Sequence, residues 1–378
     1  MAVENDKLNI FLNNLRSRAR NGYLRKIIFP EAADERVLEA ASILKEEGIA
    51  IPILVCNSID AIQVRASGLA CIEIDEERTI ALEKLLLELR SSKVGTKDEL
   101  TAEEARKMAH DPLIYGMYLL HLGEGDGLVG GAVRTSAEVV RAGLWLVGKS
   151  EGIRTVSSSF YMIVPPFRGE TQEVLTFADC AVVPNPTAEQ LADIAIASSD
   201  ARRTIVGDEP RVVFLSYSTK GSGGDGPSTA LVRQALDLVR QRRNDIIVDG
   251  EMQADSALIK SISERKMPGN LVGGRANVLI FPSLDAANIA YKLVLCLLPG
   301  AHALGPILQG MARPMSDLSR GATADDIVNI ATIVAVQSCN LHPAPSASSS
   351  RALRSDPGAC GRTLDCFSPL AKTNTENC

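Results

Sequence analysis

The chain has 378 residues, a net charge of −6 and 46% hydrophobic residues, with few aromatics. This length suits two or three domains, and the acidic balance excludes the basic surface that is typical of general nucleic-acid-binding proteins. No run of about 18 uncharged apolar residues is present, so we expect no membrane span. The polar start of the chain lacks the features of a signal peptide, which predicts a cytoplasmic protein.

Apolar runs of strand length alternate with helical periods almost throughout the chain. In the first half we predict strands at 27–29, 51–55 and 127–131, and helices at 35–47, 79–90 and 136–147. In the second half we predict strands at 155–156, 180–183, 212–215, 246–248 and 278–281. The helices expected there are 188–203, 228–242, 256–266, 286–298 and 324–337. Such alternation predicts an α/β fold in which helices cover both faces of parallel sheets.

Three further features have structural interpretations. The eight cysteines include no CxxC pair and the four histidines no HxxxH pair, so we expect no metal site. The basic runs Arg202-Arg203 and Arg240 to Arg243 fall on helical stretches and are interpreted as solvated faces. Residues 340–378 are rich in Ser, Pro, Ala and Asn without a helical or strand period, which predicts a disordered extension.

Gly221 to Gly226 form a literal GxGxxG between a predicted strand and a predicted helix. Asp249 ends the next strand, which is the context of a dinucleotide-binding fingerprint. Hydroxyl residues and Lys220 crowd the start of the same turn, however. A plain strand-to-helix turn, and a phosphate or coenzyme A contact through backbone N–H groups and Lys220, are therefore alternatives to a nicotinamide site.

A second glycine-rich turn spans residues 126–136 and is followed by Arg141. Thr135 or Ser136 can cap the next helix, whose first N–H groups could bind an anion. Arg134 and Arg141 flank this turn and could add charge-assisted hydrogen bonds to phosphate oxygens. Arg90, by itself, has the position of a basic residue that complements a helix C-terminus.

The segment 305–323 is dense in glycine, proline and hydroxyl residues, and we interpret it as a long irregular loop, where functional groups tend to lie. Arg313 and Arg320 give the loop positive charge. A helix then begins near Thr323, and Thr323 to Asp326 resembles a capping box. Spacing alone leaves open whether Asp326 is a helix cap or a catalytic group.

Five stretches together resemble the phosphate acetyltransferase family, and they cover about residues 25 to 338. They are 28–38, 126–141, 184–193, 216–253 and 276–326. The resemblance implies two α/β/α domains with mostly parallel sheets and an interdomain cleft, similar to the isocitrate dehydrogenase-like fold. The expected boundaries are 1–153 plus 306–339 for the first domain, 154–305 for the second, and 340–378 for the extension. A homodimer without a metal or other cofactor is also implied.

The resemblance implies acetyl transfer between coenzyme A and phosphate, with Asp326, Ser319 and Arg320 as catalytic residues. Asp326 would take the proton from the coenzyme A thiol, while Ser319 and Arg320 would stabilise the charge that develops on the acyl and phosphate oxygens. Arg141 and Arg90 match arginines that bind substrate or coenzyme A. We add to the substrate-binding candidates Arg134, Thr135, Ser136, Lys220 and Tyr291.

The chain departs from the family pattern at a few positions. An arginine expected four residues after the Tyr291-Lys292 pair falls on Cys296, a histidine is replaced by Arg134, and a proline is replaced by Ala142. Two alternatives to acetyl transfer therefore stay open. One is a related enzyme for larger acyl groups such as butyryl, and the other is a catalytically silent module that senses acetyl-CoA.

Overall fold

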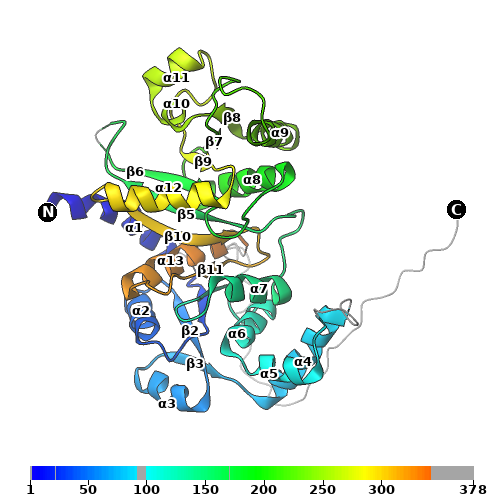
Figure 1. Cartoon of the computed structure of the whole chain (residues 1–378). Coiled ribbons are helices and arrows are strands. Elements are labelled where there is room, and N and C mark those ends of the chain that lie inside the picture. The colour runs from blue at the N-terminus through cyan, green and yellow to red at the C-terminus, as the bar shows by residue number, and fades with distance from the viewer. Residues whose placement is uncertain (1, 22, 92–98, 170, 342–378) are drawn as a thin grey trace, which may run out of the picture. The chain divides into compact units, whose positions relative to one another are not determined.

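The structure is a computed structural model that describes residues 2–21, 23–91, 99–169 and 171–341. One eleven-stranded sheet runs through these residues in the order β3-β2-β1-β4-β11-β10-β5-β6-β9-β7-β8 (Figure 1). Its strands are β1 (Lys26–Phe29), β2 (Ile51–Cys56), β3 (Ala70–Glu73), β4 (Gly127–Gly130), β5 (Ser157–Val164), β6 (Glu173–Ala178), β7 (Arg211–Leu215), β8 (Ile247–Met252), β9 (Val278–Ile280), β10 (His302–Gln309) and β11 (Met315–Asp317).

Neighbouring strands in the described sheet are parallel except at three central pairs, β11–β10, β10–β5 and β5–β6. The predicted α/β class with a mostly parallel sheet is therefore confirmed. The long antiparallel strands β5 and β10 join the two parallel parts, so the sheet is continuous where the sequence suggested separate sheets.

Helices pack on both faces of the sheet, as the alternating pattern predicts. They are α1 (Ala2–Arg20), α2 (Glu35–Glu46), α3 (Ser58–Ala66), α4 (Glu76–Arg90), α5 (Ala102–Ala109), α6 (Pro112–His121), α7 (Ser136–Leu146), α8 (Ala188–Ile205), α9 (Pro227–Arg242), α10 (Ala254–Leu258), α11 (Lys260–Lys266), α12 (Leu284–Leu297) and α13 (Ala324–Leu341). Side chains alternate along each strand: Ile27 and Phe29 join the core under α2 and α13, whereas Ile28 joins the core under α4 to α7.

Two predicted strands are wrong in position. The strand expected at 155–156 lies at β5, which opens with the buried serines 157–159, a residue type that strand patterns rarely include. The apolar run 180–183 is a loop after β6. Its backbone N–H groups donate to the buried Asp179 carboxylate from Ala181 (3.1 Å), Val182 (3.3 Å) and Val183 (2.7 Å), so they are not available for a sheet.

The predicted irregular loop at 305–323 is also shorter than expected, because β10 and β11 occupy part of it. Gly305 and Pro306 sit at a register shift of β10 between Leu304 and Ile307, which lets a strand contain residues that usually end one. The helix predicted at 256–266 is two short helices, α10 and α11, separated by Ile259 with an extended backbone. Helix α13 continues to Leu341, and the predicted extension beyond it lies outside the described residues.

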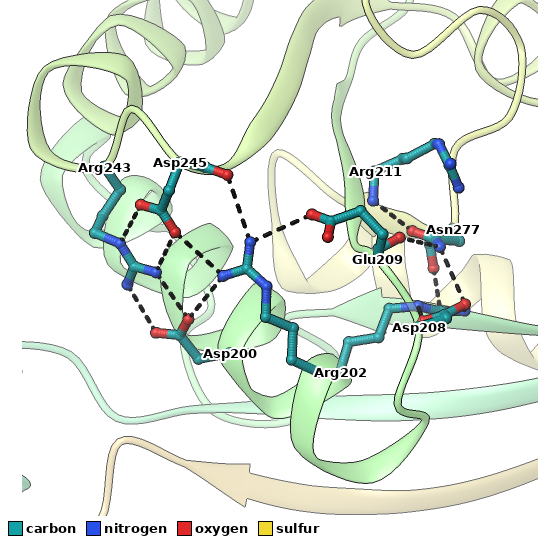
Figure 2. A network of polar contacts seen from close by, with 9 residues as sticks. Asp200, Arg202, Asp208, Glu209, Arg211, Arg243, Asp245 and Asn277 are labelled. Carbon is teal, nitrogen blue, oxygen red and sulfur yellow. Dashed lines mark hydrogen bonds and ion pairs between the residues drawn. The ribbon is translucent and has the colours of Figure 1, made fainter.

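The basic run at the end of α8 takes part in a network of ion pairs and hydrogen bonds with acidic residues (Figure 2). Arg202 is 2% exposed and forms two hydrogen bonds with the Asp208 carboxylate, at 2.7 and 2.6 Å. It also donates to the Asn277 carbonyl at 2.9 Å, which ties α8 to the approach of β9. The neighbouring Arg243 pairs with Asp200 and Asp245 nearer the surface. The interpretation of Arg202 as a solvated residue is therefore wrong, because it pairs a buried guanidinium with a carboxylate.

Candidate active site

A cavity of about 530 Å³ lies where α7, α12 and α13 approach the middle of the sheet. Four of the predicted site residues line it: Ser136, Tyr291, Ser319 and Asp326. They come from three helix segments and the loop after β11, far apart in sequence, so the fold brings them together. Further lining residues include Phe160, Cys180, Ala181, Asn288, Lys292, Leu304 and Asp317.

Asp326 is placed to act both as a helix cap and as a catalytic group, the two roles between which the sequence could not decide. Its Oδ2 accepts hydrogen bonds from the Thr323 backbone N–H (2.9 Å) and hydroxyl (2.8 Å), and its own N–H donates to the Thr323 hydroxyl (3.2 Å). This is the capping arrangement at the start of α13. The other carboxylate oxygen, Oδ1, has no hydrogen-bond partner in the described part of the chain, and the residue lines the cavity. One oxygen therefore caps the helix while the other is available for chemistry.

Ser319 and Arg320 lie in the short loop between β11 and α13. The Ser319 hydroxyl accepts from the Gly321 N–H at 3.3 Å and faces the cavity. The Arg320 side chain is exposed and is not among the lining residues, and its guanidinium has no partner among the residues that the structure describes. The Arg320 carbonyl, in contrast, accepts from Arg36 at 2.8 Å.

Arg36 connects this loop to the turn after β4, a role that the sequence did not reveal. Its guanidinium donates to the carbonyls of Arg320 and Ala322, both at 2.8 Å, and to that of Ala132 at 3.0 Å. Asp34 accepts from the same guanidinium at 2.7 Å, and this hydrogen bond is the main cause of the lowered pKa of Asp34. Arg36 thereby fixes the two loops that border the cavity against each other.

The glycine-rich turn after β4 is filled by a carboxylate of the protein itself. The buried Glu31 accepts from four successive N–H groups: Gly131 (2.9 Å), Ala132 (2.7 Å), Val133 (3.0 Å) and Arg134 (3.1 Å). The backbone donors that the sequence suggested for a substrate phosphate are thus already paired. Thr135 is the N-cap of α7 and forms a capping box with Glu138, whereas Ser136, the next residue, faces the cavity.

Two of the predicted arginines, Arg134 and Arg141, line a neighbouring cavity of about 490 Å³ between α6 and α7, together with Trp145. Arg134 pairs with Asp111 at 2.6 Å, and Arg141 is exposed. Arg90 lies over the Trp145 ring, 4.6 Å from its centroid, a cation–π contact. Arg141 and Trp145 also border a smaller hollow that includes Ser136 and Ala181, so the arginine cavity adjoins the main one.

Lys220 is not brought to the main cavity. It has a positive φ of 45°, and its N–H donates to the Glu251 carbonyl at 3.3 Å. Within the GxGxxG, Gly221 donates to the Glu251 carboxylate at 3.0 Å, Gly223 to the Ser218 hydroxyl and Gly226 to Thr229. Arg233 is the main cause of the lowered pKa of Glu251. With these donors paired inside the protein, the geometry favours the turn interpretation over a dinucleotide site.

Aromatic residues form the α12 wall of the main cavity. Tyr291 stacks on Phe160 with ring centroids 4.4 Å apart, and the Lys292 amine lies 5.1 Å from the Tyr291 ring centroid. Cys296, which replaces an expected arginine, is exposed on the same helix and does not line the cavity.

Asp317 is a site residue to which the sequence assigned no role. It ends β11, is 1% exposed and lines the main cavity. Burial raises its pKa to about 6, and the negative charge of Glu31 acts in the same direction. The Ser136 side chain and the Leu318 N–H lower the pKa by a smaller amount. A carboxylate at the end of a strand, two residues before Ser319, is the signal that could have identified it.

In the described part of the chain, no three His, Cys, Asp or Glu side chains are grouped as metal ligands would be. No helix among the described residues is long and apolar enough to cross a membrane.

Comparison with known proteins gives a consistent set of relatives. The family model for phosphate acetyl/butaryl transferase matches residues 10–335. The phosphate acetyltransferase of Acetivibrio thermocellus is 41% identical over 86% of this chain and 98% of its own. That of Thermoanaerobacterium thermosaccharolyticum is 42% identical over 83% of this chain and 95% of its own.

Solved structures give the same result. A phosphotransacetylase from Streptococcus pyogenes matches with a TM-score of 0.79 and 34% identity, covering 88% of this chain and 99% of its own. The EutD phosphotransacetylase from Staphylococcus aureus matches with a TM-score of 0.76 and 33% identity, with the same coverage.

Proposed function

The chain belongs to the phosphate acetyl/butaryl transferase family, and on that premise we propose that it is a phosphate acetyltransferase. It would transfer an acetyl group reversibly between acetyl phosphate and coenzyme A, both as substrates, without a metal or other cofactor. The observation that carries the proposal is the gathering of Asp326, Ser319, Ser136 and Tyr291 around one cavity. Mixing the pure protein with acetyl phosphate and coenzyme A, in the presence of a chelator, should raise the thioester absorbance.

We propose that Asp326 is the general base. A thiol with a pKa near 8.5 is mostly protonated at pH 7, whereas the thiolate is the nucleophile. The unpaired Oδ1 of Asp326 would take the thiol proton while Oδ2 stays bound to Thr323, so capping and catalysis are compatible. Help from a general base contributes about 10² to 10⁴ in rate. Asp326→Asn should lose turnover on this scale, and near-normal turnover would exclude the assignment.

Ser319 and Arg320 would stabilise the negative charge that forms on the acyl and phosphate oxygens. Ser319 already faces the cavity, and the unpaired Arg320 guanidinium sits one residue along the same loop. Losing one such donor costs about 10² to 10³ in kcat. Ser319→Ala should show this loss in kcat with a smaller change in KM, because the hydroxyl acts mainly in the transition state.

The arginine cavity is the proposed position of the coenzyme A nucleotide. Arg141 and Trp145 offer a cation and an aromatic face there, with Arg90 stacked on the Trp145 ring. Arg141→Ala should raise KM for coenzyme A at least tenfold and leave KM for acetyl phosphate within about twofold. An equal increase in both KM values would contradict a specific role of Arg141 in binding coenzyme A.

Comparing acetyl phosphate with butyryl phosphate as substrates decides between acetyl transfer and transfer of larger acyl groups. A faster reaction with butyryl phosphate would show that the protein is an acyltransferase for larger acyl groups and not a phosphate acetyltransferase. No thioester with either substrate, together with measurable binding of acetyl-CoA, would favour the silent sensing module.

We also propose a cytoplasmic homodimer. On α12, the exposed residues Ile289, Leu293 and Leu297 recur every four positions and so form one apolar stripe, which suits a contact with a second copy. Light scattering should give twice the chain mass. Leu293→Glu should yield monomers, whereas Ile80→Glu, at an exposed position on α4, should not. Cell fractionation tests the proposed location, and the protein should be recovered with the cytoplasmic fraction.

The domain boundaries are part of the same proposal, with 1–153 plus 306–339 as one domain and 154–305 as the other. The main cavity takes Ser319 and Asp326 from the first and Phe160 and Tyr291 from the second. The segment 154–305 expressed alone should unfold cooperatively, and a fragment without a cooperative transition would contradict the division.

A further inference from the structure

Asp317 is a buried carboxylate that the proposed chemistry leaves without a function. It lines the same cavity as Ser319 and Asp326. The Ser136 side chain and the Leu318 N–H lie near enough to lower its pKa, but among the residues described no donor reaches either oxygen with the distance and angle of a hydrogen bond. A buried acceptor without a donor is costly to the folded protein. A ligand that enters the cavity and presents a donor would remove this cost.

The surroundings of Asp317 are closely packed and include both negatively and positively charged groups. The bare Cα of Gly131 packs so closely that a Cβ there would come within 2.3 Å of Asp317 Oδ1. Glu31 lies behind this glycine, and Asp326 borders the same cavity from α13. The remaining charged or titratable groups around the cavity are Lys292 and Tyr291 of α12, Cys180 after β6, Arg320 on the adjoining loop and Arg36 behind that loop.

We propose that Asp317 is the acid–base residue for phosphate: its carboxylate accepts a hydrogen bond from the P–O–H of inorganic phosphate and takes that proton during acyl transfer. This inference rests on the proposed function. It also explains how the cavity could select phosphate over sulfate, because phosphate carries a proton at neutral pH whereas sulfate does not. Sulfate would place a bare oxygen against the unpaired carboxylate.

The environments of the two aspartates suit different tasks. Asp326 is partly exposed at a helix start, and Thr323 donates two hydrogen bonds to one of its carboxylate oxygens. Asp317 is enclosed, and burial raises its pKa to about 6. Two carboxyl groups in one site with opposed environments are a recurrent basis for dividing acid and base roles.

The step balances without any further reactant. In the direction from acetyl-CoA, the O–H bond of HPO₄²⁻ breaks and its proton moves to Asp317. The freed phosphate oxygen bonds to the acetyl carbon, the C–S bond breaks, and the departing sulfur takes a proton from protonated Asp326. The products are acetyl phosphate and the free thiol. The proton then returns from Asp317 to Asp326 by exchange with solvent.

The first test needs only the unaltered protein and two probes, inorganic phosphate and sulfate. Calorimetric titration at pH 8 should give phosphate binding about ten- to a hundredfold tighter than sulfate binding, the scale of leaving one buried polar group unpaired. Sulfate binding should strengthen as the pH falls through about 6, where protonated Asp317 becomes a donor. Equal binding of the two anions at pH 8 would overturn the proposal.

The second test compares Asp317→Asn with Asp237→Asn, which removes a charge from the exposed face of α9. The amide that replaces the Asp317 carboxylate can donate to either anion, so selectivity should fall to within about twofold and lose its dependence on pH, while turnover falls about 10² to 10⁴. The Asp237→Asn protein should match the unaltered protein. Retained selectivity in a folded Asp317→Asn protein would overturn the inference. Selective phosphate binding without any acetyl transfer would instead overturn the proposed function alone.

Discussion

Asp317→Asn should make the protein more stable at neutral pH although it removes activity. The pKa of Asp317 is raised from an ordinary 3.8 to about 6 in the folded protein, mainly by burial. The folded state therefore holds this proton more tightly than the unfolded chain. It follows that ionisation of Asp317 reduces stability progressively as the pH rises from about 4 to about 6, and that the full loss is present above that range.

The size of the effect follows from the same pKa values. A difference of one in pKa corresponds to about 1.4 kcal/mol, so the rise from 3.8 to about 6 corresponds to about 3 kcal/mol. Asparagine does not titrate and has nearly the same shape. The free energy of unfolding of the variant, relative to the unaltered protein, should therefore increase by about 2 to 3 kcal/mol between pH 4 and pH 8.

Urea unfolding at the two pH values measures this difference directly, with Asp237→Asn as the control that should show no trend. A variant whose relative stability is the same at pH 4 and pH 8 would refute the reasoning, because Asp317 would then titrate like an ordinary surface carboxylate. A gain in stability together with a loss of turnover is the pattern expected of a residue kept for function.

Other substitutions test the framework of the site. Glu31→Ala leaves four N–H groups without this acceptor, of which those of Gly131 and Ala132 are buried, and should cost at least about 2 kcal/mol in urea unfolding, whereas Glu31→Gln should cost less. Gly131→Ala places a Cβ 2.3 Å from Asp317 Oδ1 at a φ of +103° and should lower Tm and turnover together; unchanged values would contradict the close contact. Arg202→Ala removes a buried guanidinium that donates to Thr176 and to the Asn277 carbonyl, while Asp208 stays solvated; it should cost about 2 kcal/mol, with KM for both substrates unaltered once the protein is folded.

Sequence reasoning predicted elements well where periodicity and caps agreed. Helix α8 is an example: a helix was expected at 188–203, and the structure has it at Ala188–Ile205, where Thr187 forms a capping box at its start. It failed where a side chain competes with the sheet for backbone donors. The run 180–183 is apolar enough for a strand, but the Asp179 carboxylate takes its N–H groups, and no local pattern reveals that.

The candidate site shows the same division. Asp326 was identified because its spacing fits a helix start and its position matches a known family, and Ser319 was identified by the family resemblance alone; both line the cavity. Asp317 was missed because its significance lies in having no partner among the described residues, which only a three-dimensional arrangement can reveal. The reverse holds for the turn at 131–134, where glycines suggested an anion site that Glu31 already fills. At 221–226 the sequence left a plain turn open beside a ligand site, and the hydrogen bond from Gly221 to Glu251 favours the plain turn.

The Arg36 guanidinium has a mechanical consequence. It bonds to three carbonyls from two loops, so sliding the Ser319 loop past the turn after β4 requires breaking those bonds together. Helix α12 on the opposite wall is held by apolar packing of mostly half-buried residues, with Ala287 as its only buried residue in the described structure. Any breathing of the cavity is therefore easiest at the Tyr291 wall, and the polar wall is the rigid surface against which that wall would close on substrates.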